Sequence, residues 1–189
     1  MLKEEARKYY RQKREALSNA ERSKLDDLLL IQFQTLKLPF ISTLLSYWPI
    51  EENNEPNTHL FTDYIEFRNP EVKICYPKSE FKKNTMTAVV TDEDTKFKKN
   101  EYHIYEPVNG DVLLPNEIEL VFVPLLCVDR DGFRLGYGKG FYDRYLYLCS
   151  RDCILVGFSY FEPIDKLEDR NNFDVPLTTC ITPHQVYDF

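Results

Sequence analysis

Two continuous apolar runs, EIELVFVPLLCVD at 117–129 and CILVGFSY at 153–160, constrain the fold of this chain more than any other feature. A strand with one solvated face alternates apolar and polar residues, whereas a strand covered on both faces has an unbroken apolar run. Both runs are much shorter than a helix that crosses a bilayer, and the charged N-terminus is unlike an apolar signal peptide. We therefore predict a mostly parallel sheet covered by helices, in an intracellular, cytoplasmic protein.

Predicted helices and strands alternate along the chain, which is typical of an α/β domain. Residues 2–36 are rich in helix formers and free of glycine and proline, and Ser18 is a predicted cap that divides them into two helices. The sequence predicts further helices at 58–67, opened by Thr58 or the residues just before it, and from Gly140 to about Ser150. It predicts strands at 41–49, 72–77, 86–90, 120–128 and 153–160, and polar loops or hairpins around Lys78–Lys99 and Pro163–Leu177.

The length and composition of the chain suit one domain over 1–189. The hydrophobic and charged fractions, 43% and 29%, are ordinary for a soluble globular protein, and no repeat or clear linker divides the 189 residues. Five scattered cysteines without a CxxC and three distant histidines argue against disulfides, a zinc site or a histidine-based metal site. The formal net charge of −7 argues against general nucleic-acid binding. An anionic ligand would need positive charge gathered in one place.

One short segment holds most of the glycine. Four of the 6 glycines of the chain lie in GFRLGYGKGFYDRYL at 132–146. A glycine-rich turn between a strand and a helix directs backbone N–H groups at one point, which suits a phosphate. Arg134 and Lys139 add positive charge there, and Asp143 is placed to hold Mg²⁺. The spacing matches neither a Walker A motif nor a dinucleotide fingerprint, and a glycine-rich hairpin without chemical significance is the alternative.

The first predicted helix has a second group of cations. Lys3, Arg7, Arg11 and Arg14 recur at spacings of four, four and three, so they lie on one stripe of the helix. The pattern alone leaves two interpretations open, a solvated basic face and a wall that faces an anion.

The segment RLGYGKGFYDRYL at 134–146 closely resembles the signature of the 5-formyltetrahydrofolate cyclo-ligase family, also called methenyltetrahydrofolate synthetases. The resemblance implies a three-layer α/β domain like that of ribose-5-phosphate isomerases and CoA transferases, with a basic N-terminal helix, working as a monomer. Weaker pieces follow the family's order along nearly the full chain: KEEAR at 3–7, EPNT at 55–58, CYP at 75–77, YEP at 105–107, FVPLLCVDRDG at 122–132 and NNFDVPLTTCIT at 171–182.

The resemblance also implies an activity. Members of the family use ATP and Mg²⁺ to convert 5-formyltetrahydrofolate to 5,10-methenyltetrahydrofolate, with release of ADP and phosphate. The formyl oxygen is phosphorylated and N10 then attacks the formyl carbon. Phosphoryl transfer of this kind asks a protein mainly for positioning and charge neutralisation, so no nucleophilic triad is expected.

The residues implied by the resemblance fall in four groups. The ATP contacts correspond to Lys3, Glu4, Glu5, Ala6 and Arg7, and to Arg134, Leu135, Gly136, Tyr137, Gly138, Lys139, Gly140, Phe141 and Tyr142. The folate contacts correspond to Ile50, Glu55, Tyr137, Gly138, Lys139, Gly140 and Phe141. The Mg²⁺ ligands correspond to Asp143 and Asp174, and the catalytic residues to Lys139 and Arg134.

Some assignments depend on the resemblance alone. Glu55 would otherwise be a solvated loop acid and Asp174 a turn former. Pro56-Asn57 replaces the family's more usual Val-Asp, so Trp48 or Tyr47 is an alternative to Ile50 beside the pterin. Ala6 and Phe141 replace a leucine and a tyrosine, and Arg11 and Arg14 are expected to face solvent or make secondary contacts.

Two rival functions stay open at this point. One is a sugar-phosphate isomerase or CoA transferase, which would need no ATP. The other is a nucleotide-binding relative that has lost the reaction. Retention of Lys3, Arg7, Glu55, Asp143 and Asp174 favours the active enzyme over both.

Overall fold

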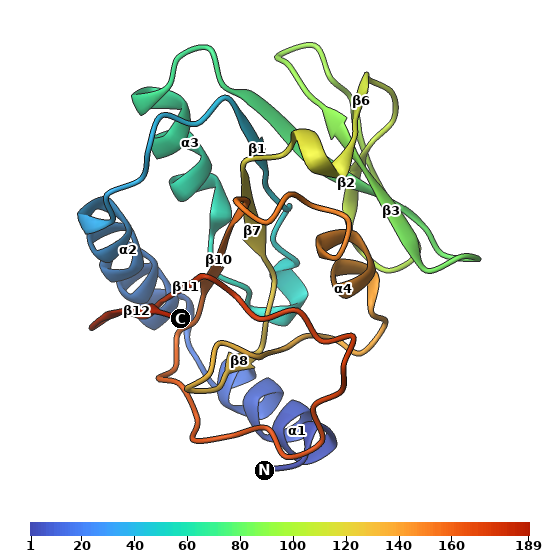
Figure 1. Cartoon of the computed structure of the whole chain (residues 1–189). Helices are drawn as coiled ribbons and strands as arrows, with labels where there is room; N and C mark the ends of the chain where they lie inside the picture. The colour runs from blue at the N-terminus through green and yellow to red at the C-terminus, as the bar shows by residue number, and fades with distance from the viewer.

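An eight-stranded sheet forms the centre of the computed structural model, which describes all of residues 1–189 (Figure 1). In chain order its strands are β1 (Thr43–Leu45), β2 (Lys73–Glu80), β3 (Thr85–Val90), β6 (Val112–Leu113), β7 (Leu120–Val123), β10 (Ile154–Phe158), β11 (Thr179–Ile181) and β12 (Val186–Asp188). Their order in the sheet is β12-β11-β10-β7-β1-β2-β3-β6. The strands from β11 to β2 are parallel and the remaining edge strands antiparallel, so the prediction of a mostly parallel sheet is confirmed.

Helices cover both faces of this sheet, which gives three layers. In Figure 1, α2 (Asn19–Thr35) and α3 (Thr58–Arg68) lie on one side of the sheet and α4 (Phe141–Leu146) on the other. Successive side chains of each strand point to opposite faces of the sheet, so each strand contributes to both cores. Leu44, Leu120 and Phe122 pack with Phe33 and Phe61 of α2 and α3, whereas Leu45, Val121 and Val123 pack with Tyr145 and Leu146 of α4.

The first helix, α1 (Lys3–Glu15), lies apart from these layers. It packs against a small hairpin of β8 (Cys127–Val128) and β9 (Arg134–Leu135), where Ala6 and Tyr10 join the buried cluster of Leu126, Cys127 and Leu135. Ser18 separates α1 from α2 as predicted, because its hydroxyl accepts a hydrogen bond from Glu21 N at 3.2 Å. None of the four helices is both long and apolar enough to cross a membrane.

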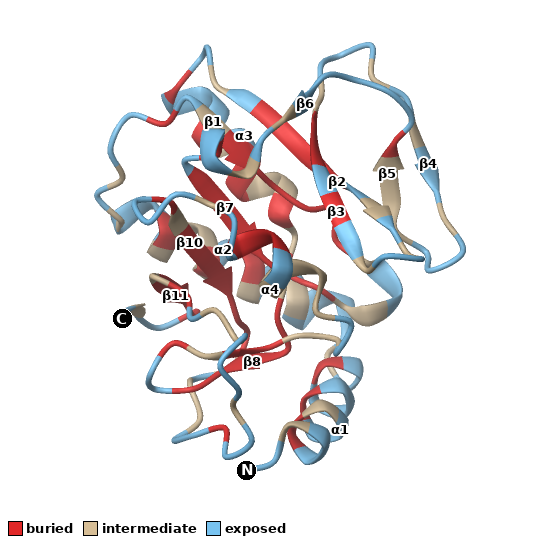
Figure 2. Ribbon diagram, turned by 45° about the vertical axis from the view of Figure 1, so that its right-hand side comes forward, coloured by how far each residue is buried: buried red, intermediate tan, exposed pale blue.

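A second hairpin lies beside the β2–β3 end of the sheet. It consists of β4 (Phe97–Lys99) and β5 (Tyr105–Pro107), and the ring of Phe97 packs 4.9 Å from that of Trp48. Two short 3₁₀ turns, η1 (Glu51–Asn53) and η2 (Pro115–Glu117), complete the elements. Figure 2 shows that burial is concentrated in the central strands, whereas the loops of this hairpin are largely exposed.

The prediction of one strand over 120–128 is wrong. Strand β7 ends at Val123 because Pro124 has no N–H to donate to a neighbouring strand. The chain then leaves the sheet, and Cys127–Val128 pair with Arg134–Leu135 instead. Gly132 therefore closes this hairpin, and only the stretch from Gly136 to Gly140 leads into the last helix.

The predicted helix from Gly140 to about Ser150 is also shorter than expected. It ends at Leu146, and the following residues continue in single turns, with Leu148 N donating to Tyr145 O at 3.0 Å. A helix of six residues has a weak dipole, so positive charge at the glycine-rich turn comes mainly from side chains.

The topology predicts where a ligand binds. Strand β1 lies between β7 and β2 in the sheet. From β1 the chain continues through α3 to β2 on one side of β1, and from β7 it continues through α4 to β10 on the opposite side. Loops that leave the carboxyl ends of two such strands diverge, and the crevice between them is where open α/β sheets bind ligands.

Candidate active site

A cleft of about 1220 Å³ opens at the carboxyl ends of β1, β2 and β7. Its walls come from α1, from the segment after β1, from the β2–β3 hairpin, from the glycine-rich turn and from the loop before β11. Residues from nearly every predicted site segment line it: Lys3, Arg7, Ile50, Glu55, the continuous stretch Arg134–Asp143, and Asp174. The topology and the glycine-rich motif therefore indicate the same place.

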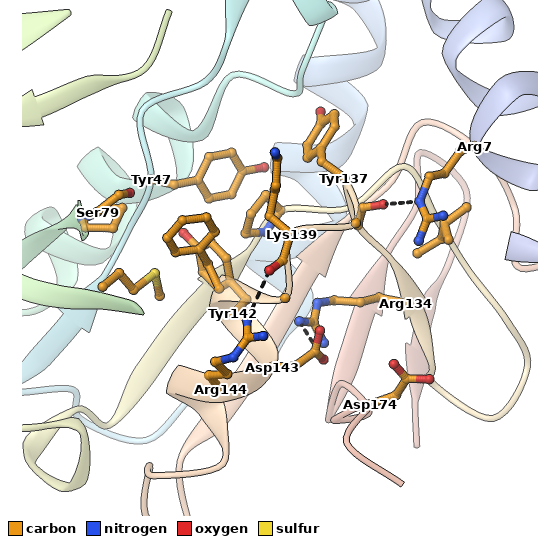
Figure 3. A pocket seen from close by; sticks show the side chains of 18 of the residues that line it. Arg7, Tyr47, Ser79, Arg134, Tyr137, Lys139, Tyr142, Asp143, Arg144 and Asp174 are labelled. Carbon is orange, nitrogen blue, oxygen red and sulfur yellow. Dashed lines mark hydrogen bonds and ion pairs between the residues drawn. The ribbon is translucent and has the colours of Figure 1, made fainter. Parts of the chain in front are cut away.

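The glycine-rich turn, defined as Gly136–Gly140, has a backbone that only glycine adopts easily. Gly138 and Gly140 have φ of +91° and +71°, in the left-handed region. A Cβ at Gly138 would lie 3.4 Å from Cζ of Arg7, whose Nε donates to Gly136 O at 3.2 Å (Figure 3). The turn thus holds a cation of α1 against its own backbone.

One end of the cleft has two ion pairs. Arg134 is 9% exposed, and its guanidinium lies 3.0 Å from the Asp143 carboxylate and donates to Val175 O at 2.7 Å. Burial lowers the pKa of Arg134, and the adjacent Asp143 carboxylate opposes that shift. On the facing wall, Lys3 Nζ lies 2.5 Å from the Asp174 carboxylate. Figure 3 shows Arg134 and Asp143 pointing toward each other, with Asp174 on the same side of the turn.

The loop that contains Asp174 is held by a buried acid. Asp129 is fully buried, accepts from Leu167 N at 2.9 Å and pairs with the guanidinium of Arg170. Within the loop, Asn171 N donates to the Asp174 carboxylate at 2.8 Å. These contacts hold the Asp174 loop at the cleft, which Asp143 and Asp174 both line although they lie 31 positions apart in the sequence.

The two aspartates are suitable ligands for Mg²⁺. Carboxylate oxygens are the ligands this cation prefers, and protein sites commonly supply one or two carboxylates while phosphate oxygens and water complete the shell. No three His, Cys, Asp or Glu side chains form a cluster that would bind a metal unaided. The donor set therefore fits an ion that arrives with a phosphate ligand.

The other end of the cleft has a buried carboxylate. Glu55 is 5% exposed, and it accepts from Ile50 N at 2.7 Å and from the hydroxyl of Tyr137. Burial raises the pKa of Glu55, and these hydrogen bonds together with the nearby Arg14 charge counteract part of the shift. Tyr47 and Tyr142 face Glu55 as neutral groups, because burial raises the pKa of each phenol.

Lys139 is a free cation between these two ends. Its side chain is exposed, forms no ion pair, and lies 5.8 Å from the ring of Tyr102. Arg144 Nη1 donates to Lys139 O at 3.0 Å, which fixes the backbone of the turn but leaves the ammonium group unpaired (Figure 3). An unpaired ammonium in an open cleft can follow a charge that moves during a reaction.

The structure does not bring every predicted residue into the cleft. Glu4 and Glu5 are exposed outside it, and the Glu5 carboxylate accepts from Leu2 N at the start of α1. Ala6 is fully buried against the β8–β9 hairpin. Arg11 lines the cleft. Arg14 does not line it and is only 2% exposed, so it does not face solvent; instead it contacts the hydroxyl of Tyr137, a residue that does line the cleft.

Sequence analysis missed one wall of the cleft. Tyr47 and Trp48, which it weighed as alternatives to Ile50, line the cleft together with Ile50. The missed side chains come from the β2–β3 hairpin, the loop before β5 and the Asp174 loop, and they include Ser79, Phe81, Met86, Tyr102 and Phe173. The CYP and YEP segments near the first four of these residues, and the NNFDVP segment that contains Phe173, were the signals available.

Comparison with known proteins identifies relatives of this chain. A family model described as the 5-formyltetrahydrofolate cyclo-ligase family matches residues 2–183. A 5-formyltetrahydrofolate cyclo-ligase of Mycoplasma pneumoniae is 34% identical over 185 residues, which cover 96% of this chain and 98% of that protein. The protein of the same name from Mycoplasma genitalium is 29% identical over 182 residues, covering 94% and 97%.

Solved structures give the same match. The NMR structure of Aquifex aeolicus 5,10-methenyltetrahydrofolate synthetase superposes with a TM-score of 0.80 at 28% identity, covering 100% of this chain and 93% of that one. A 5,10-methenyltetrahydrofolate synthetase structure from Mycoplasma pneumoniae superposes with a TM-score of 0.75 at 28% identity, covering 96% and 98%. The α/β architecture is thus shared over the whole chain.

The buried ion pair generates a stability prediction. Replacing Arg134 by methionine should lower the free energy of unfolding by about 2–3 kcal/mol, because the partly buried Asp143 carboxylate and Val175 O lose their partner. For a chain of this length that corresponds to a melting temperature lower by about 4–12 °C. Lys139→Met is the matched control and should melt as the unmodified protein does. Equal melting temperatures for the two variants would contradict a stabilising pair.

Proposed function

This chain belongs to the 5-formyltetrahydrofolate cyclo-ligase family, and we propose that the cleft at the carboxyl ends of β1 and β7 is its active site. The protein is a ligase that carries out the ATP-dependent cyclisation of 5-formyltetrahydrofolate to 5,10-methenyltetrahydrofolate, with release of ADP and phosphate. The proposals below concern which residues perform each part of this reaction.

A single observation supports the proposal most. The glycine-rich turn lies between the two ends of one cleft, with the Arg134, Lys3 and Arg7 cations toward one end and Glu55 toward the other. A reaction that transfers a phosphoryl group from ATP to folate needs both ligands against one surface with the reacting atoms in contact. This turn can provide that surface.

At the cationic end we assign the phosphates of ATP to Lys3, Arg7 and Arg134, with backbone N–H groups of the turn. Arginine forks match phosphate oxygens, and the close packing of Arg7 on Gly138 limits its freedom before ATP binds. Asp143 and Asp174 would hold Mg²⁺ there. Bound to the phosphates, Mg²⁺ neutralises and orients their oxygens.

At the other end we assign the pterin to Glu55, with Ile50, Tyr47 and Trp48 around it. A pterin presents an amino group and a ring N–H side by side, and a carboxylate accepts both hydrogen bonds. Glu55 is held by Ile50 N and Tyr137, so its direction is fixed before substrate arrives. Such preorganisation reduces the cost of binding.

The chemical step follows from this placement of the two ligands. The γ-phosphoryl group of ATP passes to the formyl oxygen, and ADP is the leaving group. N10 then attacks the formyl carbon and loses its proton, and the phosphorylated oxygen departs as phosphate. We assign Lys139 to the charge on the transferring phosphoryl group, because its ammonium is unpaired and lies between the two ends.

We further propose that the protein works as a monomer, because a single chain supplies both ends of the cleft. Sedimentation at working enzyme concentration tests this. A dimer whose dissociation removes activity would contradict it.

Turnover is the direct test of the proposed function. With 5-formyltetrahydrofolate, ATP and Mg²⁺ together, near-ultraviolet absorbance of the methenyl bridge should rise with release of one ADP per product. Omission of any one of the three should prevent the rise. ATP binding without any rise would instead support the nucleotide-binding relative, and turnover of folate without ATP would contradict the proposed mechanism.

Lys139→Ala should reduce kcat by about 10²–10³ with little change in stability, since it removes a charge that acts on the transferring phosphoryl group. The exposed Arg151 lies outside the cleft, so Arg151→Ala is a matched loss of a cation and should keep normal kcat. Normal kcat in Lys139→Ala would remove this residue from the catalytic step.

The raised pKa of Glu55 predicts a pH dependence. The ionised carboxylate accepts from the pterin, so folate affinity should be full above the pKa of Glu55 and should fall as pH drops through it. Because burial raises that pKa, the loss should begin at a higher pH than for an exposed glutamate of pKa about 4.3. Titration of folate binding against pH checks this. The Glu55→Gln variant should bind folate weakly, and its affinity should not fall further as pH drops through this range. If the same fall remained in this variant, another group would be responsible for it.

A further inference from the structure

Arg14 is a buried cation that the roles assigned above leave unexplained. It is among the largest fully buried side chains, at 2% exposure, although it lies in the last turn of a helix rich in exposed charge. Burying a guanidinium is costly unless hydrogen bonds and opposite charge compensate it. Its partners should therefore show what Arg14 does.

One of the two partners of Arg14 belongs to the folate end of the cleft. Arg14 Nη1 donates to the hydroxyl of Tyr137 at 3.0 Å, and Nη2 donates to Leu125 O. Its Nε has no partner, and no carboxylate lies within ion-pair distance. The Tyr137 hydroxyl donates its own proton to Glu55. The acid that compensates the Arg14 charge is therefore Glu55, and the Tyr137 hydroxyl connects the two by hydrogen bonds.

The geometry fixes the direction of each hydrogen bond in this chain of three residues. An arginine has only donors, so the Tyr137 oxygen must accept from Arg14. Its single hydroxyl proton is then free to point at Glu55, and accepting from a cation makes that hydroxyl a stronger donor. Arg14 thereby selects one orientation of the hydroxyl group, whereas an isolated tyrosine could turn its proton elsewhere.

A second contact ties the same residue to the Glu55 loop. Asn54 Nδ2 donates to Arg14 O at 3.0 Å, so the backbone at the end of α1 contacts the residue next to Glu55. The Arg14 side chain and the Arg14 carbonyl thus support Glu55 from two directions. Both contacts come from the helix that has Lys3 and Arg7 at its other end.

We propose that Arg14 is a positioning residue for folate binding, which acts through the Tyr137 hydroxyl to orient the Glu55 carboxylate and keep it ionised. This inference depends on the assignment of Glu55 to folate. It extends that assignment to a residue that contacts neither ligand. Arg14 is the charged group that favours the ionised form of Glu55, because Tyr47, Tyr137 and Tyr142 beside it are neutral. Loss of the Arg14 charge should therefore raise the pKa of Glu55, so that folate binding weakens at a higher pH as the solution is acidified.

The test compares ligand affinities in Arg14→Met and in Lys8→Met. Lys8 is an exposed cation of the same helix that does not line the cleft, so its variant controls for loss of charge from α1. Arg14→Met should weaken 5-formyltetrahydrofolate binding about tenfold or more, because the Tyr137 hydroxyl and the Glu55 carboxylate lose the charged donor that orients them. ATP affinity should change less than about twofold. Equal weakening of both ligands, or no weakening of folate, would overturn the proposal.

A double-mutant cycle tests the path through Tyr137. If Arg14 acts through the phenol, Arg14→Met should have little further effect on folate affinity in a Tyr137→Phe background. Full additivity of the two losses would contradict the path. Where Arg14→Met does not fold, Arg14→Lys keeps the buried charge but lacks the fork that reaches both acceptors, and it should weaken folate binding selectively.

The outcomes separate this inference from the proposed function. Calorimetric titration with 5-formyltetrahydrofolate and with ATP measures affinity without turnover. Absence of methenyl formation by the unmodified protein would refute the proposed function. Normal methenyl formation with unchanged folate affinity in Arg14→Met would refute the positioning role alone.

Discussion

The burial of the Arg134 guanidinium against the Asp143 carboxylate is the interaction on which the site depends. Arg134 comes from the β8–β9 hairpin, Asp143 from the first turn of α4, and the Val175 peptide group, which contacts both, from the segment before β11. A buried cation is tolerated only where its partners are fixed. These three segments therefore take one arrangement, and the glycine-rich turn between Arg134 and Asp143 is held at both of its ends.

The same pairing explains how a chain with a net charge of −7 can receive a polyphosphate. Arg134 pairs with Asp143 and Lys3 pairs with Asp174, whereas Arg7, Arg11 and Lys139 line the cleft without an ion pair. In the complex proposed above, phosphate oxygens would pair with these two cations and Mg²⁺ with the two carboxylates. Each ion pair would then be exchanged for two new ones, which would limit the desolvation cost of binding.

The sequence predicted the elements better than the connections. Helices at 3–35 and 58–68 and the strands of the parallel sheet follow from propensity and from apolar runs, which are local properties. The break at Pro124 was readable in principle, but the pairing of Cys127–Val128 with Arg134–Leu135 is a choice between distant partners. Arg14 shows the same limit. Its helical stripe suggests an exposed cation, and its burial depends on Tyr137 and Leu125, which lie more than 100 residues away in the sequence.

Helix α1 gains its importance from where the fold places it. Its N-terminal turn faces Asp174 and the glycine-rich turn, and its last turn faces Tyr137 and the Glu55 loop, so one rigid element contacts both ends of the cleft. Its only apolar anchor is the small cluster with the β8–β9 hairpin, which is separate from the two cores of the sheet. A shift of α1 would therefore alter the cationic end and the folate end of the cleft together. Any positive cooperativity between ATP and folate binding would then arise from the ordering of this helix. The first ligand would fix the position of α1, and the second would bind to an element that is already ordered.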